Sequence, residues 1–377
     1  MTHISQSSGR TIMQSLWSKN FTVYLSFTIL HLYLHLCNHQ TAAMATTTRA
    51  AATSRRGIFM ILSPAKTLDL SELVLVDLPP SSSLPSCDIH KTRQLAEILK
   101  SKSKKQLKDL LKVSDNISCT VKDYYDVFNV EASVLPVLLE LEDASKKIDL
   151  CANSKSAIFS FDGPAFKGIS PTTCDIDSIE YMQAYLRIID PLYGALRPLD
   201  LIQPYRLEMA SKGILKDLGT DEKSLAKWWM ASITSSILED MKSSECNVMV
   251  NLASDEYAAA VDQMKLEQED CTFVKVAFQQ EGKVIAVHAK KARGLMVKYI
   301  SENKLESVEG IQQFDLEGYG FCEDRSDDTT IVFDRSKNWQ DSTSTSTGTG
   351  TGEGQSTDKK RKAVKQLGKK AASKKKN

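Results

Sequence analysis

Residues 58–68 read Ile-Phe-Met-Ile-Leu-Ser-Pro-Ala-Lys-Thr-Leu, so that five apolar residues run directly into a polar turn that carries a lysine. A short, continuous apolar run is typical of a strand that is buried on both faces of a sheet. Residues 157–161 and 248–252 are further mostly apolar runs, and each of them also leads into a polar segment. The sequence therefore predicts three strands that end in polar motifs.

Helical segments and a β-hairpin are expected around these strands. The helical segments, in which apolar residues recur at helical spacing, are 88–148, 177–190 and 224–242, and the hairpin strands are 271–278 and 283–287. We expect an α/β (mixed α+β) fold, a single domain with a mixed central sheet flanked by helices. The expected divisions of the chain are a leader (1–57), this domain (58–337), a low-complexity linker (338–358) and a lysine-rich tail (359–377).

The ends of the predicted strands carry the candidate site. In α/β proteins, ligands bind at the carboxyl ends of strands, where helix N-termini direct free N–H groups at anions. The motif 289–294 is expected to open a helix, which would place its lysines and arginine against the preference of the helix dipole for acidic residues there. Such a departure often marks a site. A basic cleft is predicted, and a network of surface ion pairs is the alternative. The candidate residues are Ser63, Lys66, Arg206, Glu208, Ser254, Glu256, Lys290, Lys291 and Arg293.

Two neighbouring segments, 185–196 and 197–209, supply a second candidate element. The first reads as a helix stopped by a proline and followed by a glycine turn, which suggests a helix-hairpin-helix whose backbone N–H groups could contact nucleic-acid phosphates. An ordinary turn between two helices is the alternative. The second segment contains two prolines, so it cannot form one uninterrupted helix. The residues assigned to the hairpin are Tyr193, Gly194 and Arg197.

The charge of the chain is divided unevenly along its length. Residues 1–57 contain five basic residues and residues 359–377 contain ten, and neither segment contains an acidic residue. The remaining 58–358 therefore holds 33 basic and 47 acidic residues, a net charge of −14. Any polyanion bound by this acidic body needs a local basic cleft, because the overall field repels it.

Cysteine and histidine give no sign of a metal or disulfide framework. No two of the eight cysteines are closer than 23 residues, and four of the six histidines lie in the leader. These spacings exclude the usual zinc and thioredoxin motifs. We therefore predict no metal site and no cofactor. The leader contains a 17-residue apolar stretch, 21–37, which is marginal for spanning a bilayer, and a signal-peptide segment or an anchor is the alternative. No stable membrane association is expected for the body.

Four motifs occur in the order S-P-A-K-T-L (63–68), R-P-L-D-L-x-Q-P-Y-R-L-E-M (197–209), N-L-A-S-x-E-Y (251–257) and A-K-K-A-R-G (289–294). Together they resemble the YaaA peroxide-stress family over about 58–333. The resemblance implies a mixed α/β domain that binds duplex DNA through a helix-hairpin-helix and a positively charged cleft. It also implies a role in limiting iron-linked peroxide damage.

Two places depart from the pattern of this family. Asp190-Pro191 stands where the hairpin usually has Ser-Gly, and residues 161–166 read Phe-Asp-Gly-Pro-Ala-Phe where the family has F-K-G-D-V-Y. The first change affects the expected phosphate contacts of the hairpin, and the second removes a lysine and an aspartate.

Two functions fit these observations. The first is a non-enzymatic peroxide-stress protein that binds double-stranded DNA through the cleft, and we favour it here. The second is an enzyme that acts on a nucleotide or another phosphorylated small molecule in the same cleft; catalytic residues are not assigned. A cysteine peroxidase is a weaker hypothesis, because no cysteine lies in the motifs. The expected location is the cytosol or nucleus, or a plastid if the leader is a transit segment; a start at Met44 is the other reading of the leader.

Overall fold

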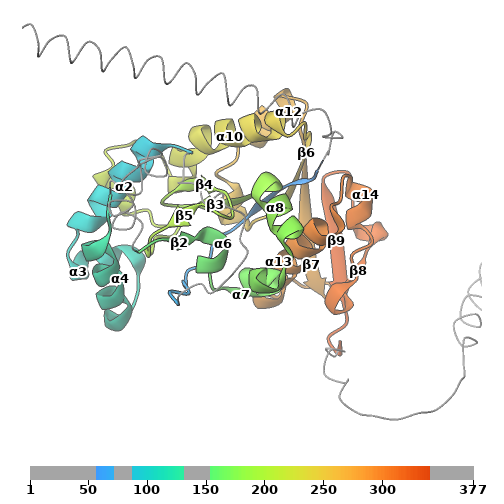
Figure 1. The fold of residues 1–377 in the computed structure, drawn as a ribbon, viewed down its shortest axis with the longest axis horizontal. Helices are drawn as coiled ribbons and strands as arrows, with labels where there is room; N and C mark the ends of the chain where they lie inside the picture. Colours follow the sequence, from blue (N-terminus) through green and yellow to red (C-terminus); the bar gives the residue numbers. More distant parts are fainter. Residues whose placement is uncertain (1–56, 72–86, 131–152, 340–377) are drawn as a thin grey trace, which may run out of the picture.

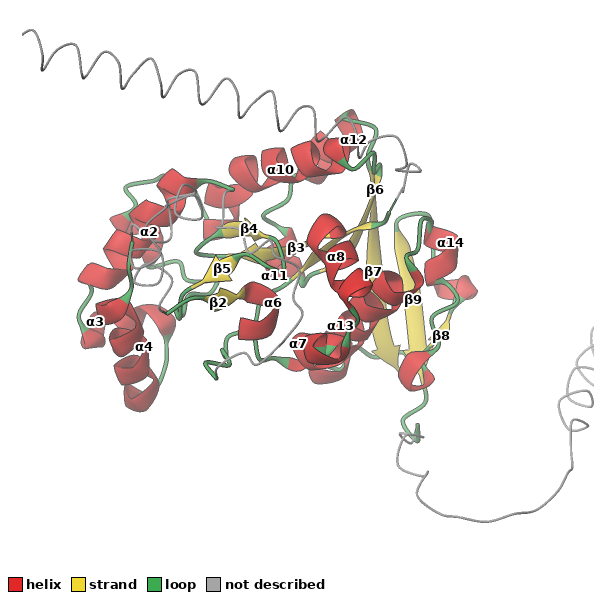
Figure 2. Ribbon diagram, viewed as in Figure 1, coloured by secondary structure: helices red, strands yellow, loops and turns green. Residues whose placement is uncertain are grey.

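The computed structural model describes residues 57–71, 87–130 and 153–339, and Figure 1 shows how they are arranged. The predictions for the leader up to residue 56, for helix at 131–148, for the linker from 340 on and for the tail lie outside these ranges. Within them, a seven-stranded sheet forms the centre and helices lie on both of its faces (Figure 2). This confirms the predicted α/β domain.

The strands of the described residues are β1 (Phe59–Leu62), β2 (Lys155–Ser156), β3 (Leu186–Asp190), β4 (Gly194–Leu196), β5 (Leu201–Ile202), β6 (Val248–Leu252), β7 (Thr272–Gln280), β8 (Gly320–Phe321) and β9 (Thr330–Arg335). The main sheet has the order β4-β3-β1-β6-β7-β9-β8, and β2 pairs with β5 separately. The five central strands are parallel, and the edge strands β4 and β8 are antiparallel to their neighbours.

The helices are α2 (Ile89–Ser101), α3 (Lys104–Leu111), α4 (Asp115–Val127), α6 (Ala157–Ser160), α7 (Pro164–Ile169), α8 (Ile176–Tyr185), α9 (Ile214–Asp217), α10 (Leu225–Ser243), α11 (Asp255–Ala258), α12 (Gln263–Gln268), α13 (Ala286–Asn303) and α14 (Val308–Ile311), with 3-10 turns η2 (Pro171–Thr173), η3 (Leu316–Gly318) and η4 (Glu323–Arg325). Side-chain caps begin several of them: Asp88, Ser103, Ser114, Asp175 and Ser224 each accept a hydrogen bond from a backbone N–H in the first turn. These caps satisfy donors that the helix itself leaves free.

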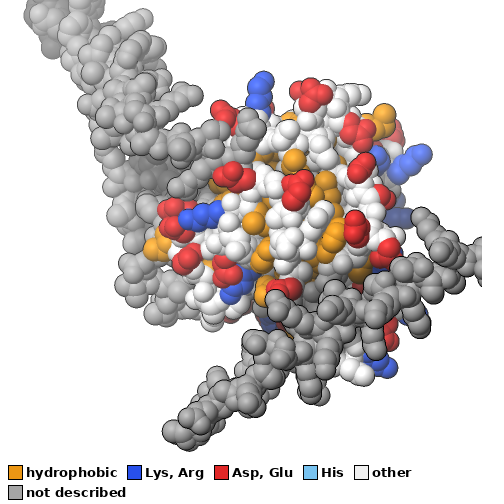
Figure 3. All heavy atoms as spheres, turned by 90° about the vertical axis from the view of Figure 1, so that its right-hand side faces the viewer, with side chains coloured by type: hydrophobic (Ala, Val, Ile, Leu, Met, Phe, Trp, Pro, Cys, Tyr) orange, Lys and Arg blue, Asp and Glu red, His pale blue; other side chains and the backbone are white. Residues whose placement is uncertain are grey.

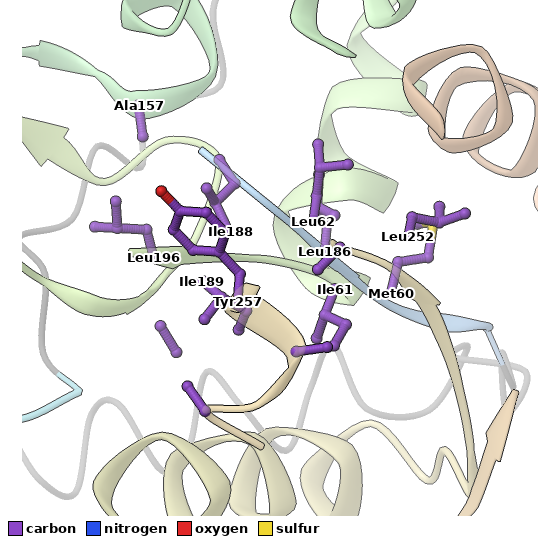
Figure 4. Close-up of a cluster of buried hydrophobic side chains, with 14 of the residues drawn as sticks. Met60, Ile61, Leu62, Ala157, Leu186, Ile188, Ile189, Leu196, Leu252 and Tyr257 are labelled. Carbon is purple, nitrogen blue, oxygen red and sulfur yellow. The ribbon is translucent and has the colours of Figure 1, made fainter. Parts of the chain in front are cut away.

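Strand β1 lies at the centre of the sheet and of the core. Its four residues and the preceding Ile58 are at most 1% exposed, which confirms that this run is buried on both faces. Figure 4 shows its side chains among those of β3 and β6. The chain passes from β1 to β3 on one side and later places β6 on the other side, so the strand order reverses at β1. Ligand sites in open α/β sheets form at such a reversal.

Two strand predictions are wrong, and the pairing of the sheet explains both. Residues 157–161 form the short helix α6 because both edges of β1 are occupied by β3 and β6. Its turn is closed by a hydrogen bond of 3.1 Å from the backbone N–H of Phe161 to the carbonyl oxygen of Ala157. Residues 283–287 do not form a hairpin strand with β7, because β7 is already paired with β6 and β9; only an isolated bridge joins Gln280 to Lys283.

The predicted helix at 177–190 is correct only in its first part. Helix α8 ends at Tyr185, and the next five residues form β3, which is fully buried beside β1. Apolar residues at 186, 188 and 189 have no exposed surface. Burial on both faces favours a strand there, although the sequence pattern also fits a helix.

A chain that ends at residue 328 is expected to lose cooperative folding, whereas a chain that ends at Trp339 should keep it. The reason is that β9 lies between β7 and β8, and its Phe333 packs against Phe278 and Phe314 with ring centroids 5.5 and 5.4 Å apart. Urea unfolding of fragments 58–328 and 58–339 followed by circular dichroism tests this. Equally sharp transitions for the two fragments would contradict it. The predicted boundary at 337 itself remains a prediction.

Candidate anion-binding site

A pocket of about 320 Å³ lies at the carboxyl ends of β1 and β6. Its walls come from the turn after β1, the turn after β6, the start of α7 and the second turn of α13. The lining residues are Leu62, Ser63, Pro64, Ala65, Lys66, Thr67, Asp162, Gly163, Pro164, Ala165, Phe166, Leu252, Ser254, Glu256, Tyr257, Lys290 and Arg293. The structure thus brings six of the nine predicted cleft residues to one cavity.

Two serines join the strand ends at the floor of this pocket. The Ser63 hydroxyl accepts a hydrogen bond of 2.9 Å from the backbone N–H of Ser254, and the two side-chain oxygens lie 3.3 Å apart. The motifs after β1 and β6 are therefore tied to each other directly. Their hydroxyl groups lie side by side in the cavity wall, where both can also donate to a ligand oxygen.

Three cationic side chains reach the pocket from two elements. Lys66 follows β1, while Lys290 and Arg293 lie on one side of α13. Lys66 is 57% exposed, so it lies at the mouth. Arg293 is half-buried, and burial lowers the pKa of its guanidinium while the nearby Asp255 carboxylate raises it. Neither Lys290 nor Arg293 forms an ion pair within 4 Å with any residue that the structure describes.

Glu208 links the 197–209 segment to this mouth. Its carboxylate pairs with the Lys66 ammonium at 2.7 Å and lies 3.5 Å from the Arg206 guanidinium. Arg206 Nε is buried and has no hydrogen-bond partner among the described residues. Glu256, in the pocket wall, accepts a hydrogen bond of 2.9 Å from the backbone N–H of Ala210. Glu208 and Ala210 thus tie this part of the chain to two residues of the pocket, Lys66 and Glu256, whereas Arg206 and Glu208 are not among the lining residues.

Lys291 is not among the residues that line the pocket. Its ammonium pairs with Glu317, which also pairs with the buried Arg335 at 3.3 Å. The placement of Lys290, Lys291 and Arg293 in the first turn of a helix is also wrong. Helix α13 begins at Ala286, one turn earlier, because the expected hairpin strand is absent.

The predicted helix-hairpin-helix at 185–196 is wrong. β3 and β4 form an antiparallel β-hairpin inside the sheet, and its turn is buried. Gly194 adopts a φ of 81°, which favours glycine, and a Cβ there would lie 2.9 Å from the Cys87 sulfur. Arg197 pairs with Asp240 at 2.7 Å. The hairpin therefore cannot present itself to a nucleic acid.

The backbone N–H groups in the turn of this hairpin donate hydrogen bonds to a side chain of the same hairpin. The Asp190 carboxylate accepts hydrogen bonds from the N–H groups of Leu192 (2.8 Å) and Tyr193 (2.9 Å) and from the Tyr205 hydroxyl. Asp190 is fully buried, and this burial raises its pKa to about 6. The donors expected for a phosphate are thus occupied by a carboxylate of the same chain.

Two residues with polar groups that line the pocket, Asp162 and Tyr257, are absent from the candidates predicted from the sequence. Asp162 pairs with Lys167 at 3.2 Å. Tyr257 is buried, and desolvation together with nearby carboxylates raises the pKa of its hydroxyl. Both were visible in the sequence, since Asp162 follows a mostly apolar run and Tyr257 ends the motif after β6.

The described residues contain neither a cluster of metal-ligand side chains nor a disulfide. No group of three or more His, Cys, Asp or Glu side chains is arranged to hold a metal ion within those residues. The described cysteines are free, and burial raises the pKa of Cys87 and Cys246 to about 11. A raised thiol pKa reduces the thiolate that reacts with peroxide.

Comparison with known proteins gives the family. The model of the family described as "Peroxide stress protein YaaA" matches residues 58–325, which include every residue of the pocket. The chain belongs to the peroxide stress protein YaaA family. This membership supports a stress-related role and confirms the resemblance seen in the four motifs. The matched region ends before β9, although β9 completes the sheet.

Two relatives match the chain over nearly all of their own length. A "UPF0246 protein" from Psychrobacter cryohalolentis is 37% identical over 284 residues, which cover 74% of this chain and 99% of the relative. A "UPF0246 protein" from Clostridium botulinum (strain Alaska E43) is 34% identical over 283 residues, covering 73% and 98%. Among the described residues, none of the helices has the length and apolar character needed to cross a membrane.

Proposed function

We propose that this YaaA-family chain contributes to the peroxide stress response by binding a small phosphorylated molecule in the pocket at the ends of β1 and β6. The observation that carries the proposal is the convergence of Lys66, Lys290 and Arg293 on one cavity of about 320 Å³. The cavity also lies where the strand order reverses, which is the usual place for a ligand in this class of sheet.

Arg293 is the strongest single argument for an anionic ligand. The Arg293 guanidinium is half-buried and forms no ion pair within 4 Å with a described residue, and the Asp255 carboxylate that acts on it already pairs with Lys275 at 2.7 Å. Because desolvation disfavours the charged guanidinium, a phosphate in the pocket would stabilise it. Guanidinium groups bind phosphate through two parallel hydrogen bonds, and lysines add positive charge at the mouth.

The small volume of the pocket and the negative charge of the protein favour a small ligand over a DNA duplex. The cavity lies at the lower end of the range for small-molecule sites, about 300–1,000 Å³. A double helix cannot enter it, although one of its phosphates could touch the mouth. Figure 3 shows acidic side chains spread over the face at the β8 and β9 end, in keeping with the net charge of −14 in 58–358. Such a field repels long polyanions.

Carboxylates stand beside the cations in the same cavity. Asp162 and Glu256 both line the wall, and the Ser63 and Ser254 hydroxyls form the floor. A cavity that holds an anion next to carboxylates has the groups that proton transfer on a phosphorylated substrate requires. The arrangement therefore fits an enzyme as well as a binding protein, and a small phosphorylated molecule is the ligand in both cases.

The full-length chain is expected to be stabilised against heat by adenosine 5′-monophosphate, and Arg293→Met should weaken that binding on the order of 10- to 100-fold. A hydrogen-bonded charged contact is worth about 1.5–3 kcal/mol, which corresponds to this factor. Methionine keeps the apolar stem of the arginine and removes the charge. Thermal shift over a ligand titration measures the change.

Lys227→Met serves as the matched control, because Lys227 is exposed on α10 and lies outside the pocket lining. It should leave the titration unchanged. If Arg293→Met and wild type gave the same titration, or if no phosphorylated ligand stabilised the wild-type chain, the pocket would not be an anion site.

Binding of duplex DNA is a second candidate, favoured by the helix pair α3–α4. These helices are joined by a three-residue turn in which Lys112 adopts the left-handed conformation. Lys105 and Lys112 have no carboxylate partner within 4 Å among the described residues. A short turn between two helices with free lysines can contact a phosphate backbone. In a chain that ends at Trp339, Lys105→Ala with Lys112→Ala should abolish duplex binding if this turn is the contact, and Arg293→Met should not.

Single replacements of the described cysteines (Cys87, Cys119, Cys174, Cys246, Cys271 and Cys322) by alanine are expected to leave protection against peroxide intact. The cysteines lie outside the pocket lining, and the raised pKa of Cys87 and Cys246 disfavours their reactive form. Survival of complemented cells in hydrogen peroxide, measured beside the melting temperature of each variant, tests this. A variant that loses protection with an unchanged melting temperature would revive the peroxidase hypothesis.

A further inference from the structure

The lysine at the mouth of the anion pocket is already paired with a carboxylate. Lys66 lines the cavity, and its ammonium lies 2.7 Å from the carboxylate of Glu208, which is outside the lining. The other two cations of the lining, Lys290 and Arg293, form no ion pair within 4 Å with a residue that the structure describes. Lys66 must therefore exchange one negative partner for another when an anion enters the pocket, whereas the other two cations gain a partner.

The two members of this ion pair differ in their freedom to move. The Lys66 side chain is 57% exposed, whereas that of Glu208 is 19% exposed. The backbone of Glu208 is held on both sides, because its N–H donates to the Ser211 hydroxyl at 3.3 Å and its carbonyl accepts from the Ser211 N–H at 2.9 Å. The Tyr125 hydroxyl also donates to the carbonyl of Arg206 at 2.8 Å. A lysine has a long flexible stem, so in an exchange of partners Lys66 moves and Glu208 stays.

Arg206 can keep the Glu208 carboxylate neutralised after the lysine leaves. Its guanidinium Nη2 lies 3.5 Å from Glu208 Oε1, which is longer than the roughly 2.7–2.9 Å of a charge-assisted hydrogen bond. Its Nε is buried and has no hydrogen-bond partner among the described residues. The guanidinium thus has donors to spare, and a small shift would bring one of them into direct contact with the carboxylate.

We propose that Glu208 is an internal competitor of the ligand: it holds Lys66 until a phosphate group takes its place, and Arg206 then retains Glu208. This rests on the proposed function and adds how the affinity of that site is set. Because the ligand has to break an ion pair, the pocket binds an anion less tightly than its three cations alone would allow. Exposed ion pairs are weak, so the expected reduction in affinity is about two- to fivefold.

Calorimetric titration of the full-length chain with adenosine 5′-monophosphate tests this through the sign of the effect. Glu208→Gln keeps the size of the side chain and removes its charge, so it should tighten binding about two- to fivefold. If Glu208 instead positions Lys66 for the ligand, the same change should weaken binding. Weaker or unchanged binding by Glu208→Gln would overturn the proposal.

Glu97→Gln is the matched control, because Glu97 is exposed on α2 and lies outside the pocket lining. It removes the same charge and should leave the affinity unchanged. A gain equal to that of Glu208→Gln would show that only the net charge of the protein matters, and would overturn the proposal.

The gain must also act through Lys66, which a double-mutant cycle measures. In a Lys66→Met background, Lys290 and Arg293 remain to hold the phosphate. Glu208→Gln should tighten binding by a smaller factor there, because no lysine is left to release and only the repulsion between carboxylate and phosphate is removed. Equal factors in the two backgrounds would overturn the proposal while leaving the anion pocket in place. If neither the wild type nor any variant bound the nucleotide, the proposed function itself would fail.

Discussion

Replacing Gly294 by alanine is expected to destabilise the domain by about 3 kcal/mol or more, because the added methyl group has no space. A Cβ at this position would lie 1.7 Å from the carbonyl oxygen of Ala165, which is backbone and cannot swing away. The two helices must move apart to admit the side chain. This is one of the two largest effects that the structure predicts.

The crossing of α7 and α13 explains why the cost is high. A Cβ at Gly168, on α7, would likewise lie 2.3 Å from the carbonyl oxygen of Lys291, on α13. Because these two glycines have no side chain, the backbones of α7 and α13 can come into direct contact. Helix α7 carries one wall of the anion pocket and α13 carries Lys290 and Arg293, so the spacing of the helices also sets the width of the pocket.

Urea unfolding of Gly294→Ala and of Gly320→Ala measures this effect. Gly320 is the matched control, since a Cβ there would meet nothing within 4 Å, and its variant should unfold like the wild type. Gly294→Ala should also lose ligand binding even at low urea, because the pocket widens. A Gly294→Ala protein as stable as the control would show that the close crossing is not needed.

The second large effect concerns Asp190 and pH. Burial raises its pKa from the ordinary 3.8 to about 6, and a difference of this size corresponds to about 3 kcal/mol. The folded state holds the proton more tightly than the unfolded state. The contribution of Asp190 to stability is therefore full below pH 3.8 and is lost as the pH rises through about 6.

The substitution Asp190→Asn should remove this loss of stability at higher pH. The amide oxygen can still accept from the N–H groups of Leu192 and Tyr193, and the amide NH₂ can donate to the Tyr205 hydroxyl. The free energy of unfolding of the variant relative to wild type should thus rise by about 2.4 kcal/mol between pH 4 and pH 7. Asp328→Asn, the same change at an exposed position, should give a flat difference. If the free energy of unfolding of Asp190→Asn relative to wild type is also independent of pH, Asp190 does not titrate in this range.

The sequence was sufficient for the centre of the sheet and for much of the pocket. Apolar runs at 58–62 and 248–252 are buried on both faces, and such strands have few alternatives. Because parallel strands end at one edge, the motifs after them had to meet, and Ser63 and Ser254 do. Strand-end position thus located Lys66 and Glu256 as well, whereas Lys290 and Arg293 reach the pocket from the second turn of α13 and follow no strand.

The β3–β4 hairpin could not be predicted from apolar runs and strand ends. Residues 185–190 have the same local pattern in a helix and in a buried strand, and only the pairing of β3 with β1 decides between them. Lys291 shows a second limit. It stands next to Lys290 in the sequence, but adjacent residues on a helix face different directions, and its partner Glu317 is brought near only by the tertiary fold.

The most direct test of the central claim is a calorimetric titration of the chain that ends at Trp339, because the ten basic residues of 359–377 would bind a duplex by charge alone. The titrants are adenosine 5′-monophosphate and a DNA duplex at equal phosphate concentration. The account predicts one nucleotide bound per chain, weakened by Arg293→Met, with no comparable heat from the duplex. Duplex binding that is unaffected by Arg293→Met, with no nucleotide binding, would contradict it.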